Sequence, residues 1–262
     1  MAELWFVGLG LDDERGLSRR AVEVLSAAGE VFAEQYTSAA PPGTLERLGR
    51  SIGREVKRLD RPLLESEAPI LSSLARHERV VLLVVGDPFA ATTHVALRLA
   101  VERAGHSWCY VPNASILTAA AGFLGLMHYR FGRTVSLPFP DPRFAPRSPI
   151  EQIEGNRTRG LHTLVLLDLN PDEGRFLSAS EALGILRERD PDGRVVADTD
   201  FLAVAARVGR AGAQGYYGPF ARLQTVDFGP PLHTVVVPAP ELHFEEAAAL
   251  ARYAVVGPPG GP

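Results

Sequence analysis

A carboxylate, two threonines and a histidine follow a strongly apolar run in the segment 86–94, which reads GDPFAATTH. Open α/β sheets bind ligands beyond the carboxyl ends of their strands. Asp87 is therefore a candidate to accept hydrogen bonds from the ammonium group of a cationic cofactor. An Asp-Pro turn followed by a Thr-capped helix accounts for the same residues without a ligand. The spacing alone weights these two interpretations about equally.

A glycine pair, Gly8 and Gly10, ends the first apolar run of the chain. Glycines in that place let the backbone turn tightly or approach a ligand closely. A dinucleotide-binding fingerprint would require a third glycine three residues after Gly10, where the sequence has Asp13. The pair predicts a structural turn or a cofactor site with about equal weight, and it supports an NAD site only weakly.

Further candidates in the second half of the chain are expected where strands end. They are Ser115 and Ile116, Leu167 and Asp168, the segment 207–209, and His233. Taken singly, each has a structural explanation, such as a helix cap, a turn cap or a buried, hydrogen-bonded histidine. Taken together, they are expected at sheet edges that face a cleft between the two halves of the chain.

Several functional classes find no support in the sequence. The seven histidines lack the spacing of a zinc-binding helix, and Cys109, the only cysteine, allows neither an internal disulfide nor a thiolate cluster. We therefore expect no metal site. Neither a G-x-S-x-G elbow nor a P-loop is present. A formal net charge of −4 disfavours a general nucleic-acid binder.

The N-terminal residues MAELWFVGLG contain no basic region ahead of an apolar stretch, so they do not resemble a secretory signal. No apolar run is long enough to cross a bilayer. We therefore expect a cytoplasmic protein without membrane contact.

Short apolar runs alternate with amphipathic segments, which is the pattern of an α/β fold. The expected strands span residues 4–10, 31–36, 79–88, 107–111, 161–169 and 232–237. The expected helices span residues 17–28 with Ser18 as N-cap, 93–104, 178–189 and 242–253. Runs that are apolar on both faces indicate strands covered by helices on both sides of a sheet. We expect parallel strands in both halves.

The segment 112–115, which reads PNAS, interrupts this alternation. It places a boundary between an N-terminal α/β domain, residues 1–112, and a C-terminal α/β domain, residues 113–262. Within the second domain, the proline-rich segment 138–149 is expected to be an exposed connection.

Six segments resemble the diphthine synthase family, in the family's order and over nearly the whole chain. They are VGLGLDDERGLS (7–18), FAEQYTS (32–38), VGDPFAATTH (85–94), PNASI (112–116), GLHTLVLLDL (160–169) and DFGPPLHTVVVP (227–238). A Gly-Asp-Pro after a strand is common to tetrapyrrole-type methylases. The AEQYTS, ATTH and GLHTL segments are more specific to the diphthine branch and carry most of the resemblance.

The resemblance implies an α/β fold class with two α/β domains of the tetrapyrrole methylase type, a cofactor cleft between them, and a homodimer. It implies a methyltransferase that uses S-adenosyl-L-methionine and releases S-adenosyl-L-homocysteine. The implied substrate is the 3-amino-3-carboxypropyl-histidine intermediate on translation elongation factor two, whose amino group is methylated during diphthamide biosynthesis. Trimethylation is expected, although the sequence leaves the number of methyl groups open. No direct contact with nucleic acid is implied.

The resemblance also carries over cofactor-binding positions where the motifs align. They are Leu11, Asp87, Ala90, Ser115, Ile116, Leu167, Val208 and His233. Ala90 and Val208 depart from the family's pattern, so backbone contacts are expected there. Glu34, Tyr36 and His94 are expected near the methyl acceptor. No catalytic residue is assigned, because positioning and desolvation account for the reaction without a strong base.

Two alternatives stay open at this point. A methylase of the same fold would act on a tetrapyrrole or on ribosomal RNA, although the net charge of −4 disfavours RNA. A non-catalytic nucleotide- or NAD-binding module has only the glycine pair in its favour. Binding of S-adenosylhomocysteine in preference to NAD would separate this module from both methylases.

Overall fold

A computed structural model describes residues 1–34, 36, 38–141, 143 and 146–255. Two residues of the AEQYTS segment, Gln35 and Thr37, lie outside this part of the chain. The chain divides into two compact units. Unit 1 comprises Met1–Ile116 and Asn170–Gly174, and unit 2 comprises Leu117–Leu169 and Arg175–Pro262. Each unit has its own five-stranded sheet.

The sheet of unit 1 is entirely parallel and has the strand order β3-β2-β4-β1-β5. Its strands are β1 (Glu3–Gly10), β2 (Glu30–Glu34), β3 (Val56–Leu59), β4 (Arg79–Val85) and β5 (Ser107–Val111). The central strand β4 and its neighbour β1 are buried along most of their length on both faces. That burial explains why both strands read as nearly continuous apolar runs in the sequence.

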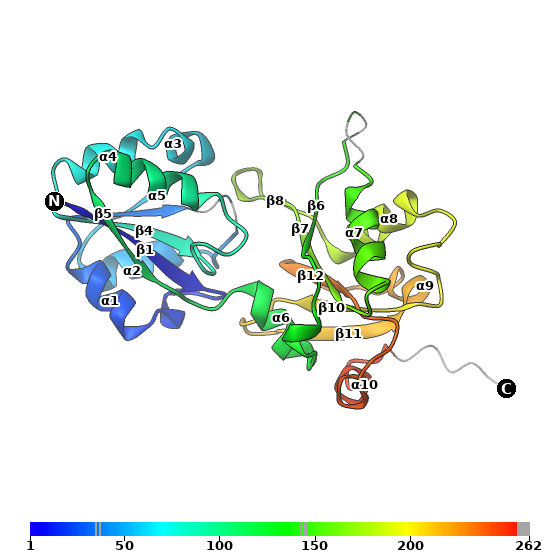
Figure 1. Cartoon of the computed structure of the whole chain (residues 1–262). Helices are drawn as coiled ribbons and strands as arrows, with labels where there is room; N and C mark the ends of the chain where they lie inside the picture. The colour runs from blue at the N-terminus through cyan, green and yellow to red at the C-terminus, as the bar shows by residue number, and fades with distance from the viewer. Residues whose placement is uncertain (35, 37, 142, 144–145, 256–262) are drawn as a thin grey trace. The chain divides into compact units, whose positions relative to one another are not determined.

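Helices cover both faces of this sheet, as Figure 1 shows. They are α1 (Arg19–Ser26) and α2 (Thr44–Ile52) on one face, and α3 (Arg61–Glu65), α4 (Ala68–Leu74) and α5 (His94–Arg103) on the other. Successive side chains of β1 alternate between the two cores, because Val7 packs with the first helix group and Phe6 with the second. The predicted N-cap of α1 is confirmed, since Ser18 Oγ accepts a hydrogen bond from the Ala21 N–H at 3.1 Å.

The sheet of unit 2 is mixed and has the strand order β11-β10-β12-β7-β6. Its strands are β6 (Val135–Leu137), β7 (Thr163–Leu167), β10 (Phe201–Ala206), β11 (Gln214–Pro219) and β12 (His233–Val237). Only β6 and β7 pair in parallel, and the other three pairs are antiparallel. The expectation of parallel strands in both halves is therefore wrong for unit 2. The connection 207–213 is too short for a parallel crossover and joins antiparallel neighbours.

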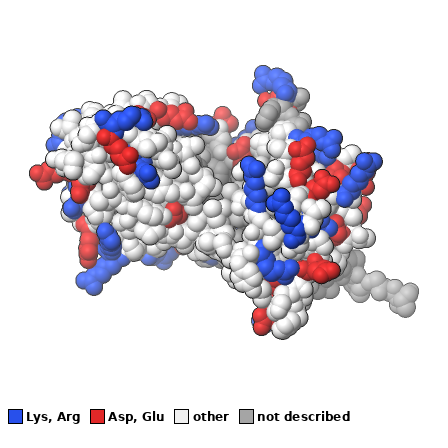
Figure 2. Space-filling view, viewed as in Figure 1, with Lys and Arg blue, Asp and Glu red and all other residues white. Residues whose placement is uncertain are grey.

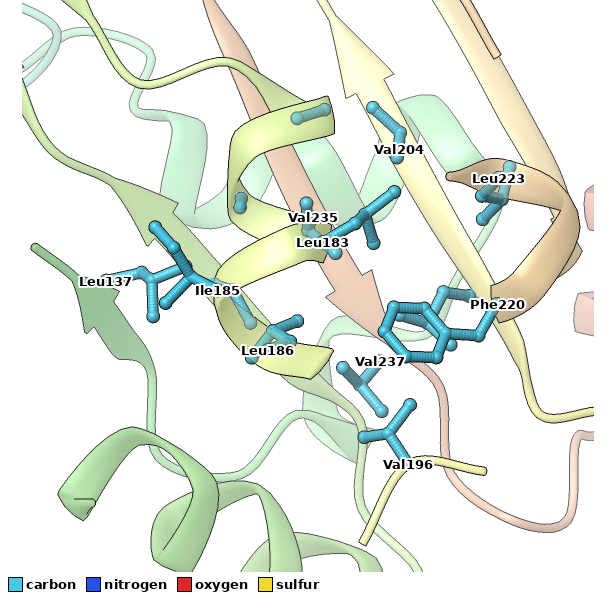
Figure 3. Close-up of a cluster of buried hydrophobic side chains, with 14 of the residues drawn as sticks. Leu137, Leu183, Ile185, Leu186, Val196, Val204, Phe220, Leu223, Val235 and Val237 are labelled. Atoms are coloured by element: carbon cyan, nitrogen blue, oxygen red, sulfur yellow. The ribbon is translucent and has the colours of Figure 1, made fainter. Parts of the chain in front are cut away.

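The main core of unit 2 lies between this sheet and helices on one face. These helices are α7 (Ser148–Arg157), α8 (Ala179–Arg189) and α9 (Phe220–Leu223). Figure 3 shows side chains of α8 and α9 packed with inward-facing residues of the strands. Examples are Leu183 of α8, Phe220 of α9 and Val235 of β12. The predicted exposed connection 138–149 is too long, because α7 begins at Ser148 and buries Pro149.

The remaining elements of unit 2 include α6 (Ile116–Leu124) and α10 (Phe244–Ala251), drawn in Figure 1 on the other face of its sheet from α7 and α8. Short elements complete the chain: the turns η1 (Glu14–Gly16), η2 (His128–Arg130) and η3 (Pro171–Glu173), and the paired strands β8 (Leu169–Asn170) and β9 (Arg175–Phe176). Among the described residues, no helix has both the length and the apolar character needed to span a membrane. Figure 2 shows basic and acidic side chains interspersed over the viewed face, consistent with the small net charge of −4.

A fully buried carboxylate, Glu246, ties three segments of unit 2 together. Its Oε1 accepts from the Met127 N–H at 2.9 Å and from His162 Nε2 at 3.0 Å. Its Oε2 accepts from Arg130 Nη1 and from the His243 N–H at 3.1 Å. Burial alone would raise the pKa of Glu246, but these hydrogen bonds outweigh it and lower the pKa. The buried carboxylate is therefore ionised and saturated with donors.

Candidate cofactor site at the strand ends of unit 1

The carboxyl ends of β1 and β4 lie side by side. The Gly10 N–H donates to Gly86 O at 3.1 Å, and the Gly86 N–H donates to Gly10 O at 2.8 Å. Both glycines have a positive φ, of 84° and 80°, which residues with a Cβ rarely adopt. These two turns direct the following residues, Leu11 and Asp87, away from the sheet at the same edge.

Asp87 lies half-buried at this edge and accepts three hydrogen bonds from described residues. Oδ1 accepts from the Phe89 N–H at 3.0 Å, and Oδ2 accepts from the Tyr110 hydroxyl and from the Asn113 N–H at 3.3 Å. An ionised carboxylate offers about four acceptor positions, so one position is left for a further donor. Burial, together with the hydrogen bond to Asp87, raises the pKa of Tyr110 and keeps its hydroxyl protonated.

Hydrogen bonds from nearby side chains to its own backbone stabilise the loop that follows Asp87. Pro88 O accepts from Thr92 Oγ1 at 2.6 Å and from His94 Nδ1 at 2.7 Å. Ala90 is half-buried in this loop, and its N–H donates to Asp87 O at 3.2 Å. The predicted Asp-Pro turn is present, and Thr93 occupies the N-cap position of α5. The side chain of Thr93 makes no capping bond to this helix.

The third strand end belongs to β5, and Asn113 connects it to the other two. Its Nδ2 donates to Gly8 O at 2.9 Å and to Gly16 O at 3.1 Å, and its Oδ1 accepts from the Ala114 N–H at 2.8 Å. Ser115 and Ile116 follow directly and are half-buried. Leu11, Asp87, Ala90 and Ser115 therefore belong to loops of one sheet edge in unit 1, and Ile116 begins α6 directly after it.

The residues expected near the methyl acceptor also occur at this edge of unit 1. Glu34, at the end of β2, and His94, at the start of α5, are both almost completely buried, and their Oε2 and Nε2 atoms are 3.7 Å apart. Tyr36 Oη lies 3.4 Å from Thr93 Oγ1. Burial raises the pKa of Tyr36. A pocket of about 210 Å³ is lined by Tyr36, Leu64, Glu65, Glu67, Thr93, His94, Ala96 and Leu97.

The other three predicted cofactor positions occur at one end of the unit 2 sheet. The register pairs His233 of β12 with Ala206 of β10 and Thr234 with Leu166 of β7. Leu167, the last residue of β7, therefore lies beside His233, and Val208 lies in the loop after β10. Unit 2 thus brings these three positions together.

His233 itself has a structural role in unit 2. It is 9% exposed, and its Nδ1 accepts a hydrogen bond from the Ala179 N–H at 3.1 Å. This bond fixes the first residue of α8. Burial, reinforced by the Arg207 charge, lowers the pKa of His233. Arg207 in turn holds its own loop by donating to Phe228 O at 2.9 Å and to Gly212 O at 3.1 Å. The neutral His233 imidazole is thus a buried, hydrogen-bonded support.

Two residues of this edge were missed by the sequence interpretation, Tyr110 and Asn113. Tyr110 is the fourth residue of a correctly predicted strand, and nothing in its spacing indicates a bond to Asp87. Asn113 lies in the PNASI segment, which gave only a boundary and a family signal. The side chain of Asn113 contacts residues up to 105 positions away in the sequence.

Comparison with known proteins shows the family of this chain. The sequence profile of the Tetrapyrrole (Corrin/Porphyrin) Methylases matches residues 3–223. A diphthine synthase of Methanocorpusculum labreanum is 38% identical over 251 residues, covering 96% of this chain and 98% of the relative. A diphthine synthase of Methanothermobacter thermautotrophicus is 39% identical over 255 residues, with coverages of 96% and 95%. The chain belongs to the diphthine synthase family.

A crystal structure of diphthine synthase superimposes with a TM-score of 0.87 at 33% identity, covering 97% of this chain and 96% of that structure. The predicted α/β fold class and the family resemblance are therefore confirmed. Membership of this family makes the chain a methyltransferase that depends on S-adenosylmethionine. The comparisons favour this family over the tetrapyrrole, ribosomal RNA and nucleotide-binding alternatives.

Proposed function

We propose that this chain methylates the amino group of the 3-amino-3-carboxypropyl-histidine intermediate on translation elongation factor two, as a step of diphthamide biosynthesis. The observation that carries the proposal is the similarity to diphthine synthases over nearly the full length of both chains. S-adenosyl-L-methionine is the proposed methyl donor and S-adenosyl-L-homocysteine the proposed product, with three methyl groups added to the amine.

The residues at the edge of unit 1 fit such a donor. Asp87 keeps one acceptor position for an ammonium group, and the space above Gly86 is open, since a Cβ there would meet no heavy atom nearer than 3.9 Å. We assign cofactor binding in this unit to Leu11, Asp87, Ala90, Ser115 and Ile116. When bound, the cofactor supplies a methyl group on a positively charged sulfur.

Leu167, Val208 and His233 of unit 2 are proposed as further cofactor-binding positions, each to be tested on its own. His233 is buried and bonded to α8, so we expect its backbone and ring edge, rather than a free imidazole, to contribute. No metal ion takes part in the proposal.

The reaction needs a neutral amine, and an α-amino group titrates near pH 8. A useful fraction is therefore neutral without a strong base. Holding donor and acceptor in line contributes about 7–11 kcal/mol in favourable intramolecular reactions, so we propose catalysis mainly by positioning and desolvation. Glu34, Tyr36 and His94 are proposed to surround the acceptor, and no catalytic residue is assigned among them.

The partners follow from the proposed substrate. We propose that the chain acts in the cytoplasm, where elongation factor two works, and that it forms a homodimer. Direct contact with nucleic acid or with a membrane is not part of the proposal.

Methyl transfer from radiolabelled S-adenosylmethionine onto elongation factor two bearing the unmethylated intermediate tests the function directly. We expect label on the factor, and none on a precorrin or on a factor whose modified histidine is replaced. Label on the precorrin alone would contradict the proposal. Calorimetry that showed NAD binding without S-adenosylhomocysteine binding would contradict it as well.

A further inference from the structure

Asn113 follows the end of β5, and its hydrogen bonds link that strand end to the ends of β1 and β4. Its two Nδ2 hydrogens go to Gly8 O and Gly16 O, and its Oδ1 accepts from the Ala114 N–H. The orientation of the amide is fixed, because both partners of Nδ2 are carbonyl oxygens and the partner of Oδ1 is an N–H group. The backbone N–H of Asn113 donates to Asp87 Oδ2 at 3.3 Å.

The glycine pair at the end of β1 makes room for this side chain. A Cβ atom at Gly8 would lie 2.7 Å from Asn113 Cβ and 2.7 Å from Gly86 O. A Cβ atom at Gly10 would lie 3.1 Å from Asn113 Oδ1, and Gly10 has a φ of +84°. The two glycines are thus explained by the approach of Asn113, without direct contact between a ligand and either glycine.

We propose that Asn113 is a positioning residue for the cofactor, with Tyr110 as its auxiliary. Asn113 sets the relative positions of the loops that carry Leu11, Asp87 and Ser115. Tyr110 fixes the same Asp87 oxygen from β5. The inference rests on the proposed cofactor role of these loops, and it goes beyond that role because neither residue is assigned to contact the cofactor.

A second buried asparagine provides a matched control. Asn156 of α7 is 2% exposed, and its Nδ2 donates to Arg133 O at 2.8 Å and to Thr163 Oγ1 at 2.9 Å. Its Oδ1 accepts from the Arg133 N–H at 3.1 Å. It also packs against a glycine, Gly132, that has no room for a Cβ. Asn156 therefore has the same kind of structural task in unit 2, where its partners Arg133 and Thr163 also lie.

The experiment compares the full-length variants Asn113→Ala and Asn156→Ala. Calorimetry measures the affinity for S-adenosylhomocysteine, urea unfolding measures stability, and kinetics separate KM for S-adenosylmethionine from kcat. We expect Asn113→Ala to weaken binding at least tenfold and to raise KM more than it lowers kcat. Asn156→Ala is expected to lose comparable stability and to bind like the wild type. Tyr110→Phe, which removes one hydroxyl on a half-exposed strand, should weaken binding about threefold.

The outcomes separate the inference from the proposed function. If Asp87→Ala weakens binding while Asn113→Ala and Tyr110→Phe both bind like the wild type, the positioning role is overturned and the cofactor site stands. If Asn113→Ala and Asn156→Ala lose affinity equally, the loss reflects general destabilisation and the role is also overturned. If the wild type does not bind S-adenosylhomocysteine, both proposals fall. Should Asn113→Ala fail to fold, Tyr110→Phe decides, since unchanged binding in that variant would contradict the inference.

Discussion

Two carboxylates, Asp87 in unit 1 and Glu246 in unit 2, contrast a proposed binding group with a structural one. Glu246 is fully buried and accepts four hydrogen bonds from described residues, which uses the capacity of a carboxylate. Asp87 is half-buried and accepts three. Burial with saturated bonding indicates a folding role, whereas partial exposure with one acceptor position left is what the proposed cofactor role of Asp87 requires.

The largest effect that tests this comparison is expected at the saturated carboxylate. Glu246→Ala leaves the half-buried Arg130 guanidinium and the buried His162 N–H without their partner, and breaking a buried pair in this way costs about 3–5 kcal/mol. Urea unfolding measures the loss. Glu245→Ala, at the exposed neighbouring position, is the control and should change stability by less than about 0.5 kcal/mol. Equal losses in the two variants would show that the hydrogen bonds of Glu246 add no more stability than an exposed glutamate does.

The opposite pattern is expected at Asp87. Asp87→Ala removes a charged hydrogen-bond acceptor, and such bonds contribute about 1.5–3 kcal/mol, so S-adenosylhomocysteine should bind about 10- to 100-fold more weakly. The free energy of unfolding should fall by less than it does in Glu246→Ala. Calorimetry and urea unfolding measure the two quantities, with Asp192→Ala on the surface of unit 2 as control. A variant that lost stability but kept its affinity would reverse the comparison.

Acid should lower the free energy of unfolding through His162, which donates a hydrogen bond to Glu246. His162 Nδ1 accepts from the Ala239 N–H at 2.8 Å and Nε2 donates to Glu246, so the fold requires the neutral ring. Burial lowers the pKa of His162 in the fold. The stability it contributes is therefore present above its unfolded pKa of about 6.5 and is lost as pH falls from there through the folded pKa.

The free energy of unfolding should consequently decrease as pH falls from about 7.5 to 5, as measured by urea titration at each pH. His162→Gln keeps a donor to Glu246 without a titrating ring, so its dependence on pH should be flatter. His233, whose pKa burial also lowers, still contributes a slope of the same sign. A His162→Gln variant with the wild-type slope would assign the dependence to other groups.

The smallest loss of stability is expected away from Asp87 and Glu246, at a single helix cap. This cap shows how much one ordinary hydrogen bond contributes. Ser178 and Glu181 form a capping box at the start of α8, and Ser178→Ala should cost about 1 kcal/mol of stability. Ser148→Ala is the control, because Ser148 begins α7 without acting as its cap. A loss at Ser178 as large as that at Glu246 would remove the contrast between exposed and buried hydrogen bonds.

Local patterns in the sequence identified the elements that local forces determine. The apolar runs gave β1, β4 and β5, Ser18 gave the start of α1, and the helix predicted over 178–189 agrees with α8 to within one residue. The β10–β11 hairpin was missed because β10 reads FLAVAA, half alanine and thus a poor strand signal, and β11 reads QGYYGP, whose glycines and proline are depleted in strands.

The site was predictable only where a motif carried it. The proposed positions Asp87 and 115–116 came from the resemblance and from their place after strands. Asn113 was not found, because its partners Gly8 and Gly16 lie 105 and 97 positions away. No spacing rule reports such a contact, which exists only once the parallel strand order is formed. The division into domains at residue 112 and the cofactor-binding roles of all eight positions stay predictions: Leu11, Asp87, Ala90, Ser115, Ile116, Leu167, Val208 and His233.

A crystal structure of the chain with S-adenosylhomocysteine tests the central claim most directly. The account predicts the ligand against the edge of the unit 1 sheet, with a donor of the ligand on the remaining acceptor position of Asp87 and the 115–116 turn in contact. Density for the ligand at any other place, with Asp87 bonded only to Phe89, Tyr110 and Asn113, would contradict the account.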